Sequence, residues 1–134
     1  LTLELRSALP LLQLDSDQIK QAFYNVVKNA SQATSPGGSI TVRSDLSDEY
    51  VSVIFTDTGE GISASEMSDV FQPYFTTKKS GTGLGLLIIR RIIREHGGDI
   101  KISSEKNKGT SVTISLPRFY RNVRLLPEPK TTNK

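Results

Sequence analysis

A chain of 134 residues is the size of one domain, and it is long enough to bury a hydrophobic core without disulfides. The sequence has no Cys and a single His, which excludes disulfides, cysteine nucleophiles and metal sites rich in Cys or His. Five basic residues and one acid follow Pro117, so that end carries +4, whereas the other 12 basic and 13 acidic residues amount to −1. Because the excess positive charge lies in the tail, we expect no nucleic-acid partner.

The apolar segments are too short to cross a bilayer, since the longest run, Leu84 to Ile89, has six residues and includes a Gly. We therefore expect no membrane contact by this chain and a cytoplasmic location, and whether the parent protein carries a membrane anchor elsewhere is left open. The first residue is Leu rather than Met, so we expect a piece of a longer protein. We interpret residues 1–117 as the folded domain and residues 118–134 as a flexible basic tail.

In chain order, alternating Leu residues at positions 1 to 5 predict a strand. Apolar residues at helical spacing predict a helix from Asp17 to about Thr34, capped by Asp15 or Ser16. After the break at residues 35–38, two alternating segments, at 40–46 and 51–55, predict the strands of a hairpin.

The second half begins with a short helix at residues 63–71, with Ser63 as its cap and Glu66 in the capping-box position. An irregular basic segment at 73–83 precedes a second long helix, from Leu84 to His96, which Gly97 and Gly98 end. Two strands, at 99–104 and 110–116, close the domain. The order of elements predicts an α+β fold in which helices cover a mixed sheet.

Two Asn side chains share one face of the first long helix, because Asn25 and Asn29 are four residues apart. Asn is unfavourable inside a helix, so two in successive turns need a reason. One interpretation is a solvated face or amide bonds to a neighbouring loop. The other is a set of amide oxygens directed at Mg²⁺ that is bound together with phosphates. The spacing alone leaves both interpretations open.

A carboxylate and two glycines follow the strand that ends near Phe55, in the sequence DTGEG at residues 57–61. Asp57 would lie at the end of that strand, and Gly59 and Gly61 would allow a ring to approach the backbone closely. The alternative is an ordinary turn, which is what an isolated Asp-x-Gly-x-Gly usually forms.

The second long helix opens on the Gly-rich sequence GTGLGL at residues 81–86. Free N–H groups and the positive end of the helix dipole make such a start an anion site. The spacing matches neither the dinucleotide fingerprint nor the P-loop. Lys78 and Lys79 lie just before it, so the segment resembles a lid over phosphates, although a solvated basic loop is the simpler alternative.

Taken together and in this order, these segments resemble the ATP-binding catalytic domain of bacterial sensor histidine kinases, in the GHKL superfamily. The resemblance covers residues 1–117 and is specific as an ordered set. Its motifs are an N box NVVKNA at 25–30, a G1 box DTGEGI at 57–62, an F box FQPYFTTK at 71–78, a G2 box GTGLGL at 81–86 and a closing Gly109-Thr110.

The resemblance implies a Bergerat-type α/β sandwich: a mixed, mainly antiparallel sheet, helices on one face and a short ATP lid at residues 72–82, as in nitrogen-regulation-type kinases. It implies ATP and Mg²⁺ as cofactors, with Asp57 accepting a hydrogen bond from the adenine amino group and Asn29, helped by Asn25, binding the metal. Lys78 is the candidate contact to the γ-phosphate, and Thr110 would support the adenine end. The implied nucleotide-site residues are Asn25, Asn29, Ala33, Asp57, Gly59, Gly61, Ile62, Phe75, Thr77, Lys78, Gly81, Thr82, Gly83, Leu84, Gly85, Leu86 and Thr110.

The resemblance also implies partners outside this chain. The histidine that accepts the phosphate lies in an upstream dimerisation hairpin, and a cognate response regulator follows in the pathway. Dimerisation belongs mainly to that hairpin, so we expect this chain to be monomeric. We interpret His96 as a C-terminal cap that suits the helix dipole. Gln32 replaces a basic residue that many relatives carry, and Lys78 or Lys79 would take over its phosphate contact.

Other functions fit parts of the same sequence. A dimeric aspartic protease would use Asp57-Thr58-Gly59, but it requires a nearly all-β chain. Topoisomerase-type ATPases of the superfamily place a catalytic Glu where Asn25 stands. A non-catalytic ATP-sensing module keeps the whole site without phosphotransfer. Serine kinases of the anti-sigma type are less consistent with the Phe-Thr-Thr-Lys segment.

Overall fold

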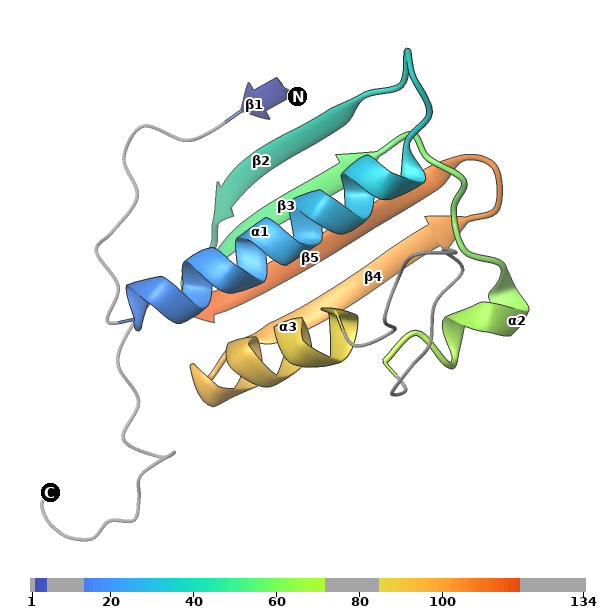
Figure 1. Cartoon of the computed structure of the whole chain (residues 1–134). Coiled ribbons are helices and arrows are strands. Elements are labelled where there is room, and N and C mark those ends of the chain that lie inside the picture. The colour runs from blue at the N-terminus through green and yellow to red at the C-terminus, as the bar shows by residue number, and fades with distance from the viewer. Residues whose placement is uncertain (1, 5–13, 72–84, 119–134) are drawn as a thin grey trace, which may run out of the picture.

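Figure 1 shows the computed structural model of the chain, which describes residues 2–4, 14–71 and 85–118. The expected lid at residues 72–82 lies outside these ranges, as does the expected tail apart from Arg118. In the described residues, the elements follow the order β1, α1, β2, β3, α2, α3, β4, β5. This is the α+β order that the sequence predicts.

The sheet has five strands in the order β1-β2-β3-β5-β4. The strands are β1 Thr2–Glu4, β2 Ile40–Leu46, β3 Tyr50–Asp57, β4 Asp99–Glu105 and β5 Gly109–Pro117. β1 runs parallel to β2, and every other neighbouring pair is antiparallel, so the sheet is mixed and mainly antiparallel as expected. β5 is inserted between β3 and β4, which places the end of β3 beside the start of β5.

The two long helices, α1 (Ser16–Ala33) and α3 (Gly85–Glu95), lie side by side on one face of the sheet, as Figure 1 shows. The side chain of Asp15 accepts hydrogen bonds from the N–H groups of Asp17 and Gln18, which caps α1 as predicted. The core fills the space between these helices and the sheet. Its largest fully buried side chains in the described residues are Ile89, Ile93, Ile114 and Leu116.

The short helix α2 (Ala64–Met67) is only four residues long, whereas the sequence predicts a helix over residues 63–71. Ser63 and Glu66 form the predicted capping box, since each side chain bonds the backbone N–H of the other. Residues 68–71 continue as turns, and none of the helix residues is buried. Val70 is buried in these turns, so the apolar burial in this segment begins only after the helix has ended.

Strand alternation gives the sheet a face covered by helices and an open face. Val112, Ile114 and Leu116 of β5 are buried under the helices. The open face carries hydroxyl pairs across strands, between Ser52 and Ser115 at 3.1 Å and between Thr56 and Ser111 at 3.0 Å. Polar side chains on one face and apolar ones on the other are typical of a sheet covered on one side.

Candidate functional site

Asp57 is the last residue of β3 and is 6% exposed, one of the few buried polar residues in the described ranges. Its alternation places it on the covered face, together with Val51 and Phe55. Its Oδ1 accepts a hydrogen bond from the backbone N–H of Gly59 at 2.8 Å. A buried carboxylate is costly unless groups that donate hydrogen bonds surround it, and the Gly59 N–H is one such group.

Thr110 lies directly opposite Asp57 in the β3–β5 register and opposite Ser104 in the β4–β5 register. The three residues therefore form a row across three neighbouring strands, on the covered face. The Thr110 and Ser104 hydroxyl oxygens are 2.7 Å apart. The sheet thus brings Thr110 to the end of the strand that carries Asp57.

The glycines of the G1 box are required by close backbone packing. A Cβ at Gly59 would overlap the carbonyl oxygen of Ala33, and the N–H of Glu60 donates to that same oxygen at 3.1 Å. Gly61 has a φ of +72°, and a Cβ there would overlap the carbonyl oxygen of Glu105. The sequence suggests that these glycines make room for a ring; in the described residues they make room for the end of α1 and the β4–β5 turn.

Asn29 faces the start of α3. A Cβ built on Gly85 would lie 3.5 Å from its Nδ2 and 3.7 Å from its Oδ1. Gly85 is the first residue of α3 that the structure describes, so the amide lies beside this end of the helix. Asn25 is half-buried one turn earlier on α1. The structure therefore brings Asn29 of the N box close to Gly85 of the G2 box.

Two other expected site residues are engaged in the fold itself. The Leu86 side chain packs against the hydrophobic core, so only its backbone is left for a ligand. The N–H of Ile62 donates to the Ser104 hydroxyl at 2.7 Å. The expected residues that lie outside the described ranges are Phe75, Thr77, Lys78, Gly81, Thr82, Gly83 and Leu84.

Ser104 is the residue that motif reasoning misses. Its hydroxyl bonds the G1 box, Gly109 and Thr110 at once. The sequence gives only a weak signal for Ser104. In the alternation of β4, Ser104 stands where a third apolar residue is expected after Ile100 and Ile102.

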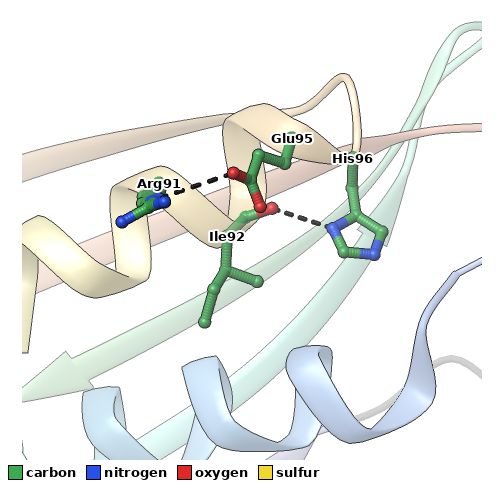
Figure 2. Close-up of polar contacts among 4 residues, drawn as sticks. All are labelled: Arg91, Ile92, Glu95 and His96. Atoms are coloured by element: carbon green, nitrogen blue, oxygen red, sulfur yellow. Dashed lines mark hydrogen bonds and ion pairs between the residues drawn. The ribbon is translucent and has the colours of Figure 1, made fainter.

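His96 ends α3 and connects it to α1. Its Nδ1 lies 2.8 Å from the carbonyl oxygen of Ile92, as Figure 2 shows, and its Nε2 accepts the N–H of Asp15 at 3.1 Å. His96 therefore lies at the C-terminal end of α3 as predicted, and its ring contacts both the last turn of α3 and the residue that caps α1. The ion pair between Arg91 and Glu95 beside it is exposed.

Within the described ranges, no three His, Asp or Glu side chains group as a metal site. None of the helices in those ranges is long and apolar enough to cross a membrane. The 18-residue helix α1 contradicts the all-β chain that an aspartic protease requires.

Comparison with known proteins agrees with this geometry. Among solved structures, the catalytic domain of the histidine kinase ThkA superposes with a TM-score of 0.77 at 35% identity, over 87% of this chain and 77% of that one. The mycobacterial sensor histidine kinase MprB gives a TM-score of 0.72 at 31% identity, over 86% and 81% of the two chains. The fold is therefore that of histidine kinase catalytic domains.

Residues 14–119 match the family described as histidine kinase-, DNA gyrase B-, and HSP90-like ATPase, and the chain belongs to this family. It is homologous to the catalytic domains of sensor histidine kinases. The sensor histidine kinase ZraS of Escherichia coli K12 is 42% identical over 81% of this chain. Sporulation kinase D of Bacillus subtilis is 41% identical over 80%. The chain spans 23% and 21% of the lengths of these two relatives.

Proposed function

We propose that this chain binds Mg-ATP and presents its γ-phosphate to a histidine on a dimerisation hairpin supplied by another part of the protein. The observation that carries the proposal is the buried carboxylate of Asp57 at the end of a central strand, 6% exposed. An adenine amino group donates hydrogen bonds there, whereas guanine places a carbonyl oxygen at the same position. Such a site prefers the base that donates to it.

The phosphate end supports the magnesium part of the proposal. Amide oxygens are hard ligands of the kind Mg²⁺ accepts, and Asn29 offers one beside the first turn of α3. Asn25, one turn away on the same helix, is the second candidate ligand. When bound, Mg²⁺ supplies neutralisation of charge on the phosphate oxygens. Lys78 is our candidate for an additional contact to the γ-phosphate.

The acceptor histidine lies elsewhere, because both ring nitrogens of His96, the only His of this chain, have hydrogen-bond partners between α1 and α3. In the proposed step, a nitrogen of the acceptor imidazole bonds to the γ-phosphorus. The bond from that phosphorus to the oxygen that bridges to the β-phosphate breaks, and ADP leaves. The role of this chain is to position and to stabilise charge. A response regulator would then take the phosphate, and we expect this chain alone to be monomeric.

The test is a calorimetric titration of the chain with ATP, with and without Mg²⁺. Asp57→Asn replaces an acceptor oxygen by an N–H donor in a buried position, so we expect at least about tenfold weaker ATP binding. Asp45→Asn is the matched control, because Asp45 is exposed in β2 and pairs with Ser52 on the open face.

Two outcomes would contradict parts of the proposal. Equal ATP binding by wild type and Asp57→Asn would remove the assigned base site. ATP binding without phosphotransfer to an added dimerisation hairpin would favour the non-catalytic ATP-sensing module instead.

A further inference from the structure

We infer that Ser104 is a positioning residue that fixes which way the Thr110 hydroxyl points its proton, and thereby sets the preference of the site for an amino group on the base. This inference rests on the proposed ATP site. It is carried by a cluster of hydrogen bonds at the β4–β5 end, which joins three segments of the chain.

The hydrogen bonds of Ser104 determine to which neighbour its hydroxyl proton points. A serine hydroxyl has one proton to donate and two lone pairs to accept with. The N–H of Ile62 donates to the Ser104 oxygen at 2.7 Å and occupies one lone pair. The carbonyl oxygen of Gly109, 2.9 Å away, can only accept, so it takes the Ser104 proton.

Thr110 is therefore the donor in its contact with Ser104. Its oxygen lies 2.7 Å from the Ser104 oxygen, whose remaining lone pair must accept the Thr110 proton. With that proton used, the Thr110 oxygen offers the nucleotide only lone pairs. Thr110 then resembles Asp57 in its hydrogen bonding, although it carries no charge.

The register places these two acceptors on neighbouring strands, Asp57 opposite Thr110. A group that donates two hydrogen bonds, such as the adenine amino group, is favoured beside a pair of acceptors, whether it reaches Thr110 directly or through a water. A base with a carbonyl at that position is disfavoured by both residues. Ser104 thus acts on base preference through Thr110, without touching the base.

The same hydroxyl also holds the loop that follows the carboxylate of Asp57. Ile62 ends the G1 box, and its N–H is tied to Ser104. Removal of the hydroxyl would therefore have two effects. Loosening of the loop weakens binding of every nucleotide, whereas release of the Thr110 proton weakens only the preference for an amino group. The ratio of the affinities for a nucleotide with an amino group and one with a carbonyl group distinguishes these two effects.

The experiment compares ATP with inosine triphosphate, which has a carbonyl in place of the adenine amino group, by calorimetric titration of the chain. In Ser104→Ala, Thr110 is free to turn its proton toward the base. We expect the preference for ATP over inosine triphosphate to fall about fivefold, the effect of one neutral hydrogen bond. Ser103→Ala is the matched control, because Ser103 is an exposed neighbour on β4 that pairs with Ser111 on the open face.

Two further variants make the result independent of any loss of folding in Ser104→Ala. Ser104→Thr and Ser104→Val have the same shape and differ in the hydroxyl, so we expect the Thr variant to keep the preference and the Val variant to lose it. In a Thr110→Val background, Ser104→Ala should leave the ratio unchanged, because the hydroxyl that Ser104 orients is gone.

The outcomes distinguish this inference from the proposed function. If wild type binds no ATP, both are overturned. If wild type binds ATP and Ser104→Ala weakens both nucleotides by the same factor, Ser104 only supports the loop and the inference is wrong, while the proposed function stands. Equal ratios in Ser104→Thr and Ser104→Val would overturn the inference as well.

Discussion

The base end of the proposed site lies on three neighbouring strands, with Asp57, Thr110 and Ser104 in one row, whereas the phosphate end lies where α1 and α3 pack, at Asn29 and Gly85. At the base end, strand register and backbone hydrogen bonds determine each side-chain position. At the phosphate end, the positions depend on how two helices pack. The base end is therefore pre-organised by the sheet, whereas the phosphate end depends on the packing of α1 against α3.

The base end and the phosphate end also differ in how closely other atoms approach their glycines. A Cβ at Gly59, Gly61 or Gly109 would overlap backbone atoms, of Ala33, Glu105 and Asp57 respectively. Among the described residues, a Cβ at Gly85 would meet the Asn29 side chain alone, at ordinary contact distance. Glycines at the base end are thus structural requirements of the fold, whereas the contacts that the structure describes at Gly85 do not require a glycine.

The largest expected effect comes from breaking the base end with Gly61→Ala. Gly61 has a φ of +72°, and its new Cβ would overlap the Glu105 carbonyl oxygen. Gly37→Ala is the matched control, with a φ of +91° and no atom of the described residues within 4 Å of the new Cβ. We expect Gly37→Ala to lower the free energy of unfolding by about 1–2 kcal/mol through the backbone conformation alone. Gly61→Ala should lower the free energy of unfolding by about 1–3 kcal/mol more than Gly37→Ala, because the added methyl group overpacks the site. It should also abolish ATP binding.

Urea unfolding of both variants, followed by ATP titration of each, measures this difference. Equal losses of stability at Gly61 and Gly37 would show that the approach of the β4–β5 turn to the G1 box is not a constraint on the fold.

A smaller and opposite effect is expected at the phosphate end. Gly85→Ala adds a methyl group at 3.5 Å from the Asn29 amide nitrogen, in the first turn of α3. Because Ala is the better helix former, stability should stay unchanged or rise by up to about 1 kcal/mol. The gain in ATP affinity that Mg²⁺ provides should fall by about fivefold, roughly 1 kcal/mol, since the methyl group takes space beside the amide.

ATP titration with and without Mg²⁺, together with a thermal melt, tests this variant. A drop in melting temperature like that of Gly61→Ala would mean that the surroundings of Gly85 are packed as tightly as those of Gly61. An unchanged effect of Mg²⁺ would argue against Asn29 as a metal ligand.

The sequence predicted the elements well where the signals are local. Asp15 caps α1 and the Ser63–Glu66 capping box forms, because a cap depends on residues three or four apart. Alternating apolar residues placed β2 to β5 to within one or two residues at most ends. The length of α2 was overestimated, since a cap shows where a helix begins but not how far it continues.

For the proposed site, the sequence could point to Asp57 and Asn29 as candidates, but not to the contacts that hold their neighbours in place. Position 61 requires a glycine because a Cβ there would overlap the carbonyl oxygen of Glu105, a residue far away in the sequence. The role of Ser104 depends on Ile62, which is 42 positions away. Such contacts follow from the insertion of β5 between β3 and β4, which no single motif contains.

The smallest expected effect concerns α2, which follows the G1 box. Hydrogen bonds from the Ser63 backbone and hydroxyl to its carboxylate hold the pKa of Glu66 below the ordinary value. A lowered pKa in the folded state means that the stabilisation is present above the unfolded-state pKa and is lost as the pH falls through the folded-state pKa. Wild type should therefore exceed Glu66→Gln slightly in stability at pH 7, with the difference vanishing in acid.

Urea unfolding of both across this pH range measures the difference, with Asp48→Asn in the exposed β2–β3 turn as control. A difference that persists below the pKa of Glu66 would mean that the capping box does not depend on the charge of the carboxylate. Unchanged ATP binding in Glu66→Gln would show that the base end is held by the sheet and by Ser104 rather than by the helix that follows it.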